Sequence, residues 1–189
     1  MRSLLLALPL LLLTGCGLQS IPRALNETEA AWAEVQNQYK RRADLVPNLV
    51  QTVKGYAAHE KETLDAVVSA RAKATQITVD ANTLTPEKLK EFQRAQSGLS
   101  QALGRLMVVA EKYPDLKAAQ NFRDLQVQLE GTENRITTAR RRYIETVKDF
   151  NNLVTVFPTS LTNSLMFKHE KKPQFEAGEA EQATPKVEF

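Results

Sequence analysis

The sequence predicts an all-α protein, an antiparallel up-and-down four-helix bundle, and three observations support that prediction. Apolar residues recur at alternating steps of three and four along most of the chain, which is the spacing of one face of an α-helix. Only seven glycines occur in 189 residues, so long segments contain no turn signal. Aromatic residues make up 6% of the chain, few for a β-sandwich or barrel, whereas 42% hydrophobic residues can build a helical core.

The first stripe of apolar positions extends from about residue 24 to residue 75 and contains Pro47. At 1.5 Å per residue this run would be about 78 Å long, against about 42 Å for the run 86–113. If the two lay antiparallel, about half of the longer run would have no partner. We therefore expect a break at Pro47 and helices over 24–45 and 48–75. The alternatives are one long helix kinked at Pro47, because the stripe crosses it without a phase jump, and a break at Gly131-Thr132.

Two further helices are predicted over 86–113 and 116–157. Thr85-Pro86-Glu87 is a helix start, with a hydroxyl at the N-cap, a proline in the first turn and an acid beside it. Tyr113-Pro114 ends that helix, because proline disfavours helical backbone in its predecessor. Asp115 can cap the next helix, which ends before Pro158. Residues 24–167, including a short helix or apolar lid after Pro158, would form the bundle, and residues 168–189 a charged flexible tail.

Residues 1–15 have the composition of a lipoprotein signal peptide. One positive charge precedes an apolar run of about ten residues, half of what a membrane-spanning helix needs. The run ends in Leu13-Thr14-Gly15-Cys16, which resembles the lipobox of bacterial lipoproteins, and Cys16 is the only cysteine. We expect cleavage before Cys16 and acylation of its thiol. The alternative is a simple signal peptide with a chance cysteine.

Acylation of Cys16 would make membrane lipid a partner and residues 16–23 a short tether. Gly17, rather than aspartate, follows the cysteine, which favours the outer membrane if the cell is Gram-negative. A single cysteine permits no disulfide within the chain. Basic and acidic residues number 25 and 22 and are interspersed, so we expect a solvated helical surface and no nucleic-acid partner.

Several long stretches of the chain resemble the LemA family. They are RRADLVPNLVQTVKGYAAHEKETL (41–64), ALGRLMVVAEKYPDLKA (102–118), LEGTENRITTARRRYIETV (129–147), FP at 157–158 and the final PKVEF. The resemblance implies a four-helix bundle on the outer side of a bacterial membrane, without an established catalytic mechanism. It also suggests an envelope protein as partner, such as a membrane protease or a TPM-domain protein. The chain departs from the family in its lipobox and in Tyr143-Ile144, where the family has Tyr-Asn.

The sequence contains no catalytic or metal-binding constellation. Di-metal sites in helical bundles use a glutamate three residues before each histidine, but Tyr56 and Met166 precede His59 and His169 at that spacing. No Gly-rich phosphate loop and no nucleophile elbow is present. We therefore expect no enzyme activity and no cofactor. A cryptic metal site or a cavity for a hydrophobic ligand between the helices stays as the alternative.

Charged and polar residues on or near the stripes form the candidate functional site. Since buried charges need partners, Arg41 or Arg42 is expected to meet Asp44, Glu111 or Glu133 and fix the helix register. The alternative is a partner-docking patch, because a break at Pro47 would lie beside the turn at 113–115. The candidates are Arg41, Arg42, Asp44, Asn48, Glu111, Tyr113, Asp115, Glu133 and Arg140.

The function predicted from these features is a membrane-anchored, non-enzymatic adaptor or scaffold for an envelope protein complex. The end of the chain offers a second hypothesis. Val187 and Phe189 alternate about a glutamate after Pro185, which suits addition of a strand to the sheet edge of a partner. The alternative is a frayed terminus.

Overall fold

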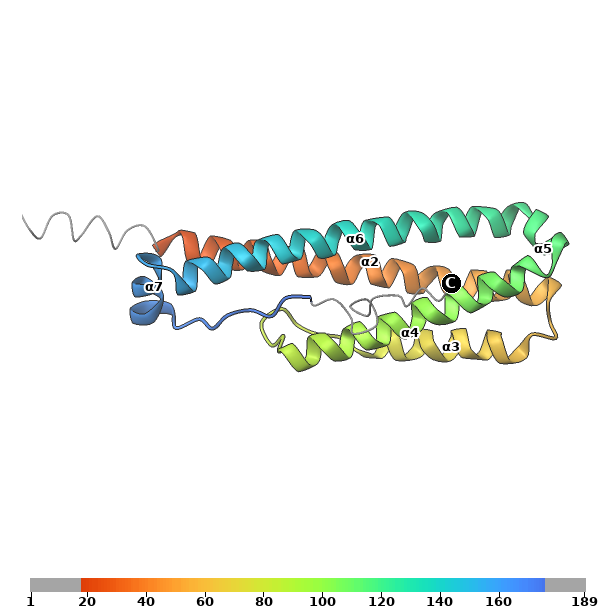
Figure 1. The fold of residues 1–189 in the computed structure, drawn as a ribbon, viewed down its shortest axis with the longest axis horizontal. Coiled ribbons are helices and arrows are strands. Elements are labelled where there is room, and N and C mark those ends of the chain that lie inside the picture. The colour runs from red at the N-terminus through yellow and green to blue at the C-terminus, as the bar shows by residue number, and fades with distance from the viewer. Residues whose placement is uncertain (1–17, 176–189) are drawn as a thin grey trace, which may run out of the picture.

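The computed structural model describes residues 18–175, and all regular secondary structure within that range is helical. Because the described elements are all helices, the all-α prediction is confirmed. Consecutive long helices run in opposite directions (Figure 1). The predictions for Cys16 and for Pro185 to Phe189 lie outside the described residues. The elements are α2 (Ser20–Tyr56), α3 (Lys61–Gln76), α4 (Pro86–Glu111), α5 (Pro114–Ala118), α6 (Gln120–Thr155), α7 (Thr159–Thr162) and the π-helical turn η1 (Asn163–Phe167).

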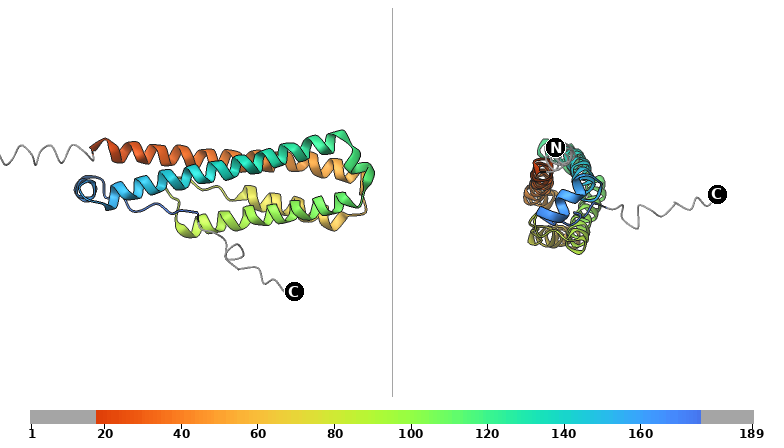
Figure 2. Two further views of the ribbon diagram at one scale, coloured as in Figure 1. Left: turned by 45° about the horizontal axis from the view of Figure 1, so that its top comes forward. Right: turned by 90° about the vertical axis from the view of Figure 1, so that its left-hand side faces the viewer.

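The predicted break at Pro47 is wrong, because α2 continues through it to Tyr56. The expectation of a long overhang assumed that this helix packs against the shorter helix 86–113. Instead α2 packs along α6, and the two have 37 and 36 residues, about 55 Å each. The shorter helices α3 and α4 pack against each other and cover one part of this long pair (Figures 1 and 2).

A side chain from α3 compensates for the hydrogen bond that Pro47 cannot make. Proline has no amide hydrogen, so the carbonyl of Ala43, four residues earlier, has no donor within the helix. Arg71 of α3 donates from Nε to that carbonyl at 2.8 Å. Ala43 is buried, and a buried carbonyl left without a donor costs about 1–3 kcal/mol. The proline therefore fits inside α2 because α3 lies beside it.

The chain turns between α2 and α3 at residues 57–60. The amide of Ala57 donates to the Val53 carbonyl at 2.8 Å, and the amide of Glu60 donates to the Ala57 carbonyl at 3.1 Å. Ala57 is fully buried, whereas Tyr56 is 47% exposed. The helix predicted over 48–75 is thus interrupted by a turn between Tyr56 and Lys61.

The connection from α3 to α4 folds back onto α2. Trp32 donates from Nε1, and Gln36 from Nε2, to the carbonyl of Val79, at 2.8 and 2.7 Å. The helix α4 then begins as predicted, with Pro86 in its first turn and the amide of Lys88 donating to the Thr85 hydroxyl at 3.3 Å.

Residues 168–175 pack against the bundle, so the flexible tail does not begin at 168 as predicted, and the rest of the predicted tail, 176–189, lies outside the described residues. Phe175 is 8% exposed, and its ring centroid lies 6.0 Å from Trp32 and 5.5 Å from Tyr143. The Tyr143 hydroxyl donates to the Pro173 carbonyl at 3.0 Å. Burial raises the pKa of the Tyr143 hydroxyl well above its ordinary value. The remaining neighbours of this aromatic cluster include Tyr39 and Phe92.

We predict that the effects of Arg71→Ala and Pro47→Ala depend on each other. Arg71→Ala alone should destabilise the fold by about 1–3 kcal/mol, since it leaves the Ala43 carbonyl without a donor. In the Pro47→Ala background an alanine amide at position 47 can donate to that carbonyl, so the loss should shrink by about 1 kcal/mol or more. Urea unfolding of the four proteins in the double-mutant cycle measures this coupling.

Arg94→Ala is the matched control, because Arg94 is an exposed arginine of α4. Its effect should stay within about 0.5 kcal/mol in both backgrounds. Equal losses from Arg71→Ala with and without Pro47 would show that the arginine does not compensate for the proline.

Candidate functional site

Arg42 lies in the middle of the bundle and is 1% exposed. From α2, its Nη1 donates to Glu133 Oε1 of α6 and to Ser100 Oγ of α4, both at 2.7 Å. Its Nη2 donates to the side-chain oxygen of Gln96 at 2.8 Å and to the Gln96 carbonyl at 3.1 Å. A buried guanidinium needs such partners, because an uncompensated charge in the interior costs several kcal/mol.

The same network also reaches α3. Gln96 is 6% exposed, and its Nε2 donates to the carbonyl of Ala74 at 3.0 Å. We call Arg42, Glu133, Ser100, Gln96 and Ala74 the Arg42 network. One side chain and its direct partners thereby connect all four long helices.

The Arg42 network adjoins an aromatic and cationic environment. The guanidinium carbon of Arg42 lies 5.0 Å from the ring centroid of Tyr39, and that of Arg140 lies 4.7 Å from the ring of Phe175. Burial raises the pKa of the Tyr39 hydroxyl, and the positive charges of Arg140 and Arg42 oppose that rise. Glu133 is the acidic partner, with a side chain that is 44% exposed. Water can therefore reach the carboxylate but not the guanidinium.

The other candidate residues do not join this network. Arg41 and Asp44 are exposed on α2. Glu111, one of the three acidic partners considered, pairs with Lys117 of α5. Of the possible pairings, the structure brings together Arg42 and Glu133.

The suggested single surface of residues 40–48 and the turn at 113–115 is wrong. It required a corner at Pro47, but α2 continues to Tyr56, so Arg41 lies fifteen residues, about 22 Å, before the end of the helix. Tyr113 is half-buried, and its hydroxyl donates to Glu60 Oε1 at 3.2 Å. It therefore supports the turn between α2 and α3. Asp115 is exposed in α5.

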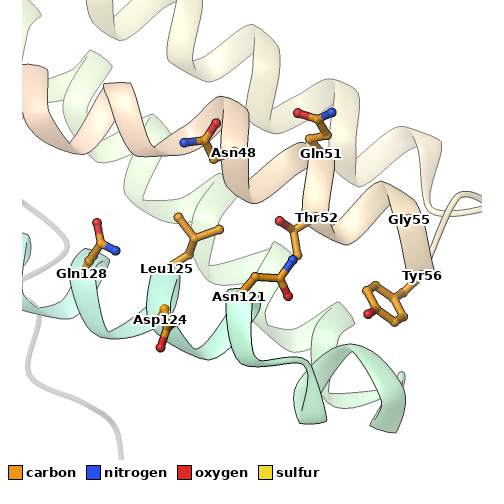
Figure 3. Close-up of a pocket in the computed structure, with 9 residues that line it drawn as sticks. All are labelled: Asn48, Gln51, Thr52, Gly55, Tyr56, Asn121, Asp124, Leu125 and Gln128. Carbon is orange, nitrogen blue, oxygen red and sulfur yellow. The ribbon is translucent and has the colours of Figure 1, made fainter.

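A groove between α2 and α6, near α5, was not predicted. Figure 3 shows Thr52 of α2 facing Asn121 of α6, with Tyr56 closing the α5 end. Polar residues on each helix recur at the helical spacing of three and four, so each helix presents a polar stripe to the groove. This spacing was the signal in the sequence. The lining residues, which we call the polar groove, are Asn48, Gln51, Thr52, Gly55, Tyr56, Asn121, Asp124, Leu125 and Gln128.

Residues 18–175 contain no group of three or more His, Cys, Asp or Glu side chains placed to hold a metal ion. His59 is exposed in the turn after α2, and His169 stacks on the ring of Phe167 at 5.8 Å. None of the helices described within residues 18–175 combines the length and the hydropathy of a membrane-spanning segment.

The LemA family model matches residues 31–189 of the chain. Protein LemA of Metamycoplasma hominis is 29% identical over 138 residues, which cover 73% of this chain and 59% of that protein. Magnetosome protein MamQ 2 of Paramagnetospirillum magneticum is 33% identical over 69 residues, or 36% of this chain and 25% of that protein. MamQ of Magnetospirillum gryphiswaldense is 30% identical over the same length. The chain thus spans less than two thirds of each of these relatives.

We predict that Glu133→Ala destabilises the fold by about 1.5–3 kcal/mol, the range for a hydrogen bond to a charged group. The substitution leaves the buried Arg42 cation without its counter-charge. Arg42→Met in the same chain should recover most of the loss, because an apolar side chain of similar length needs no partner. Denaturant unfolding of both single variants and the double variant provides the measurement.

Arg41→Ala serves as the control, since Arg41 is exposed one position away, and it should change the unfolding free energy by less than about 0.5 kcal/mol. If Glu133→Ala were as mild as this control, the ion pair would not stabilise the bundle.

Proposed function

Because the chain belongs to the LemA family, we propose that it is a lipid-anchored, non-enzymatic adaptor that presents a protein-binding groove at a distance from a bacterial membrane. The anchor would be acylated Cys16. The partner would be another envelope protein, and a membrane protease or a TPM-domain protein is suggested by analogy with the family.

The observation that supports this proposal most directly is that one helix links the two ends of the molecule. Ser20, the first residue of α2, lies at one end of the bundle, and Tyr56, its last, lines the polar groove near the other end. The helix between them is about 55 Å long. An anchor four residues before Ser20 would therefore place the groove far from the lipid.

The packing of α2 favours a rigid spacer. α6 lies along its length, and the Arg42 network and the contact of Arg71 fix α3 and α4 against its middle. A helix restrained on these sides cannot bend freely, so its two ends keep a constant separation. A rigid separation is what an adaptor between a membrane and a second protein requires.

The polar groove has the chemistry of a docking surface for a polar protein segment. Amide side chains of Asn48, Gln51, Asn121 and Gln128 line it, and each provides both donors and acceptors. Asn48, Gln51 and Asn121 are exposed, so they are accessible to a partner. Backbone amides and carbonyls of an extended partner segment would match this set of groups.

We predict that a photo-crosslinker at Gln51 captures a membrane or envelope protein in intact cells, and that Gly55→Trp abolishes the capture. A Cβ atom added at Gly55 meets no atom within 4 Å, and Gly55 lines the groove, so a large side chain at this position would occupy it. Tryptophan also has a higher helix propensity than glycine, by a few tenths of a kcal/mol, so the bundle should stay folded.

Gly104→Trp is the matched control, because Gly104 is also a helical glycine with no atom within 4 Å of an added Cβ, but it lies in α4. Capture should persist in this variant. Capture that survives Gly55→Trp, or that is lost equally in both variants, would contradict docking in the polar groove.

A further inference from the structure

The end of the bundle where α2 begins displays a cluster of exposed apolar side chains. Of eleven large hydrophobic residues that are exposed within residues 18–175, five fall between positions 156 and 166. Proteins that remain monomeric in water rarely expose apolar side chains in such a group. The five residues, which we call the apolar cap, are Val156 (55% exposed), Phe157 (73%), Leu161 (51%), Leu165 (70%) and Met166 (63%).

The apolar cap is held in place by the buried face of the same segment. Asn163 of η1 is 7% exposed, and its Nδ2 donates to the carbonyls of Val154 at 3.3 Å and His169 at 3.0 Å. Its Oδ1 accepts from the amide of His169 at 3.0 Å. Phe167 packs on the cluster formed by Ile21 and Phe150. The outward position of the cap is therefore a fixed feature of the fold.

The start of the described chain lies at the same end as the cap. Ile21 in the first turn of α2 belongs to the cluster on which Phe167 packs, and Figures 1 and 2 show α7 beside the start of α2. Leu18 is a further exposed apolar residue at this end, with 39% of its surface exposed, and it follows Cys16 by two residues. A chain spans at most about 3.6 Å per residue, so two residues can separate an anchor from Leu18 by no more than about 7 Å.

We propose that the apolar cap inserts into the phospholipid bilayer and forms a second membrane contact beside the lipid anchor. The inference rests on the proposed acylation of Cys16, because acyl chains at that position bring the bilayer to this end of the bundle. Exposed leucine, methionine and phenylalanine side chains are suited to the boundary between headgroups and acyl chains. Exposed Lys168 and Lys171 follow the cap and match the negative phosphates of phospholipids.

Two contacts would also orient the molecule. A single anchor on a short tether would let the bundle lie flat or stand upright, whereas an inserted end face allows only the upright position. The long axis of α2 and α6 would then point away from the bilayer. The polar groove, at the α5 end of the bundle, would be held near its greatest possible height.

The test measures the membrane depth of a nitroxide label on the full-length, acylated protein. Leu165→Cys introduces the labelling site, and Val127→Cys on α6 is the matched control with a similarly exposed apolar residue, 67% against 70%. Because Cys16 is the only native cysteine and its thiol would be acylated, each variant has a single free thiol. The protein is reconstituted in vesicles of phosphatidylethanolamine and phosphatidylglycerol.

We expect the label at position 165 to collide more often with dissolved oxygen, which concentrates in lipid, than with a water-soluble nickel complex. The label at position 127 should show the reverse order. A label at 165 that behaves like the one at 127, in protein that stays bound to the vesicles, would overturn the cap insertion alone. Spin–spin broadening at 165 without lipid exposure would also overturn it, in favour of a contact between two copies. Protein that fails to bind the vesicles would overturn the lipid anchor, and the insertion with it.

Discussion

The buried guanidinium of Arg42 is the constraint on which the arrangement of the helices depends. A cation at 1% exposure is tolerable only if its partners stand in the correct positions, and these partners come from α4 and α6. Gln96 extends the requirement to α3 through Ala74. Apolar stripes alone tolerate sliding, since leucine and valine contacts are not directional. The hydrogen bonds of Arg42 are directional, so they select one register among the many that would bury a similar apolar area.

Pro47 imposes a second polar requirement only five residues later. Its missing amide leaves the Ala43 carbonyl without a donor, and Arg71 provides one. Arg42 and Arg71 therefore act in opposite directions across the interface between the two pairs of helices: α2 donates to α4, and α3 donates to α2. Both contacts lie where the short pair α3 and α4 meets the long pair α2 and α6. The stretch KRRADLVPNLV thus contains Arg42 and Pro47, which create two of the polar contacts between these pairs.

The sequence predicted the helices better than it predicted their partners. Thr85 and Pro86 are local signals, so the start of α4 was correct. The path of α2 depended on which helix packs against it, and helical periodicity does not report that. Phe175 looked like part of a charged tail because the space it fills, between Trp32 and Tyr143, exists only in the folded bundle. The polar groove was not predicted because its lining is mostly uncharged and comes from amides of two helices whose pairing the sequence does not report.

These features describe a rod whose two ends differ in chemistry. One end has the exposed apolar residues and the first turn of α2, and the other has a groove of amides. The polar groove keeps its lining only if α2 and α6 keep one register, because both helices contribute to it, so the proposed docking role depends on Arg42. The most direct test is a pulsed electron spin resonance distance between labels at Lys54→Cys in α2 and Lys148→Cys in α6, with Cys16 replaced by serine. The two sites are exposed and far apart along the bundle, so a slip of the helices changes their distance. We predict one narrow distance distribution in the wild-type background and a broadened or double distribution with Arg42→Met. An equally narrow, unshifted distribution with Arg42→Met would contradict the claim that Arg42 sets the register.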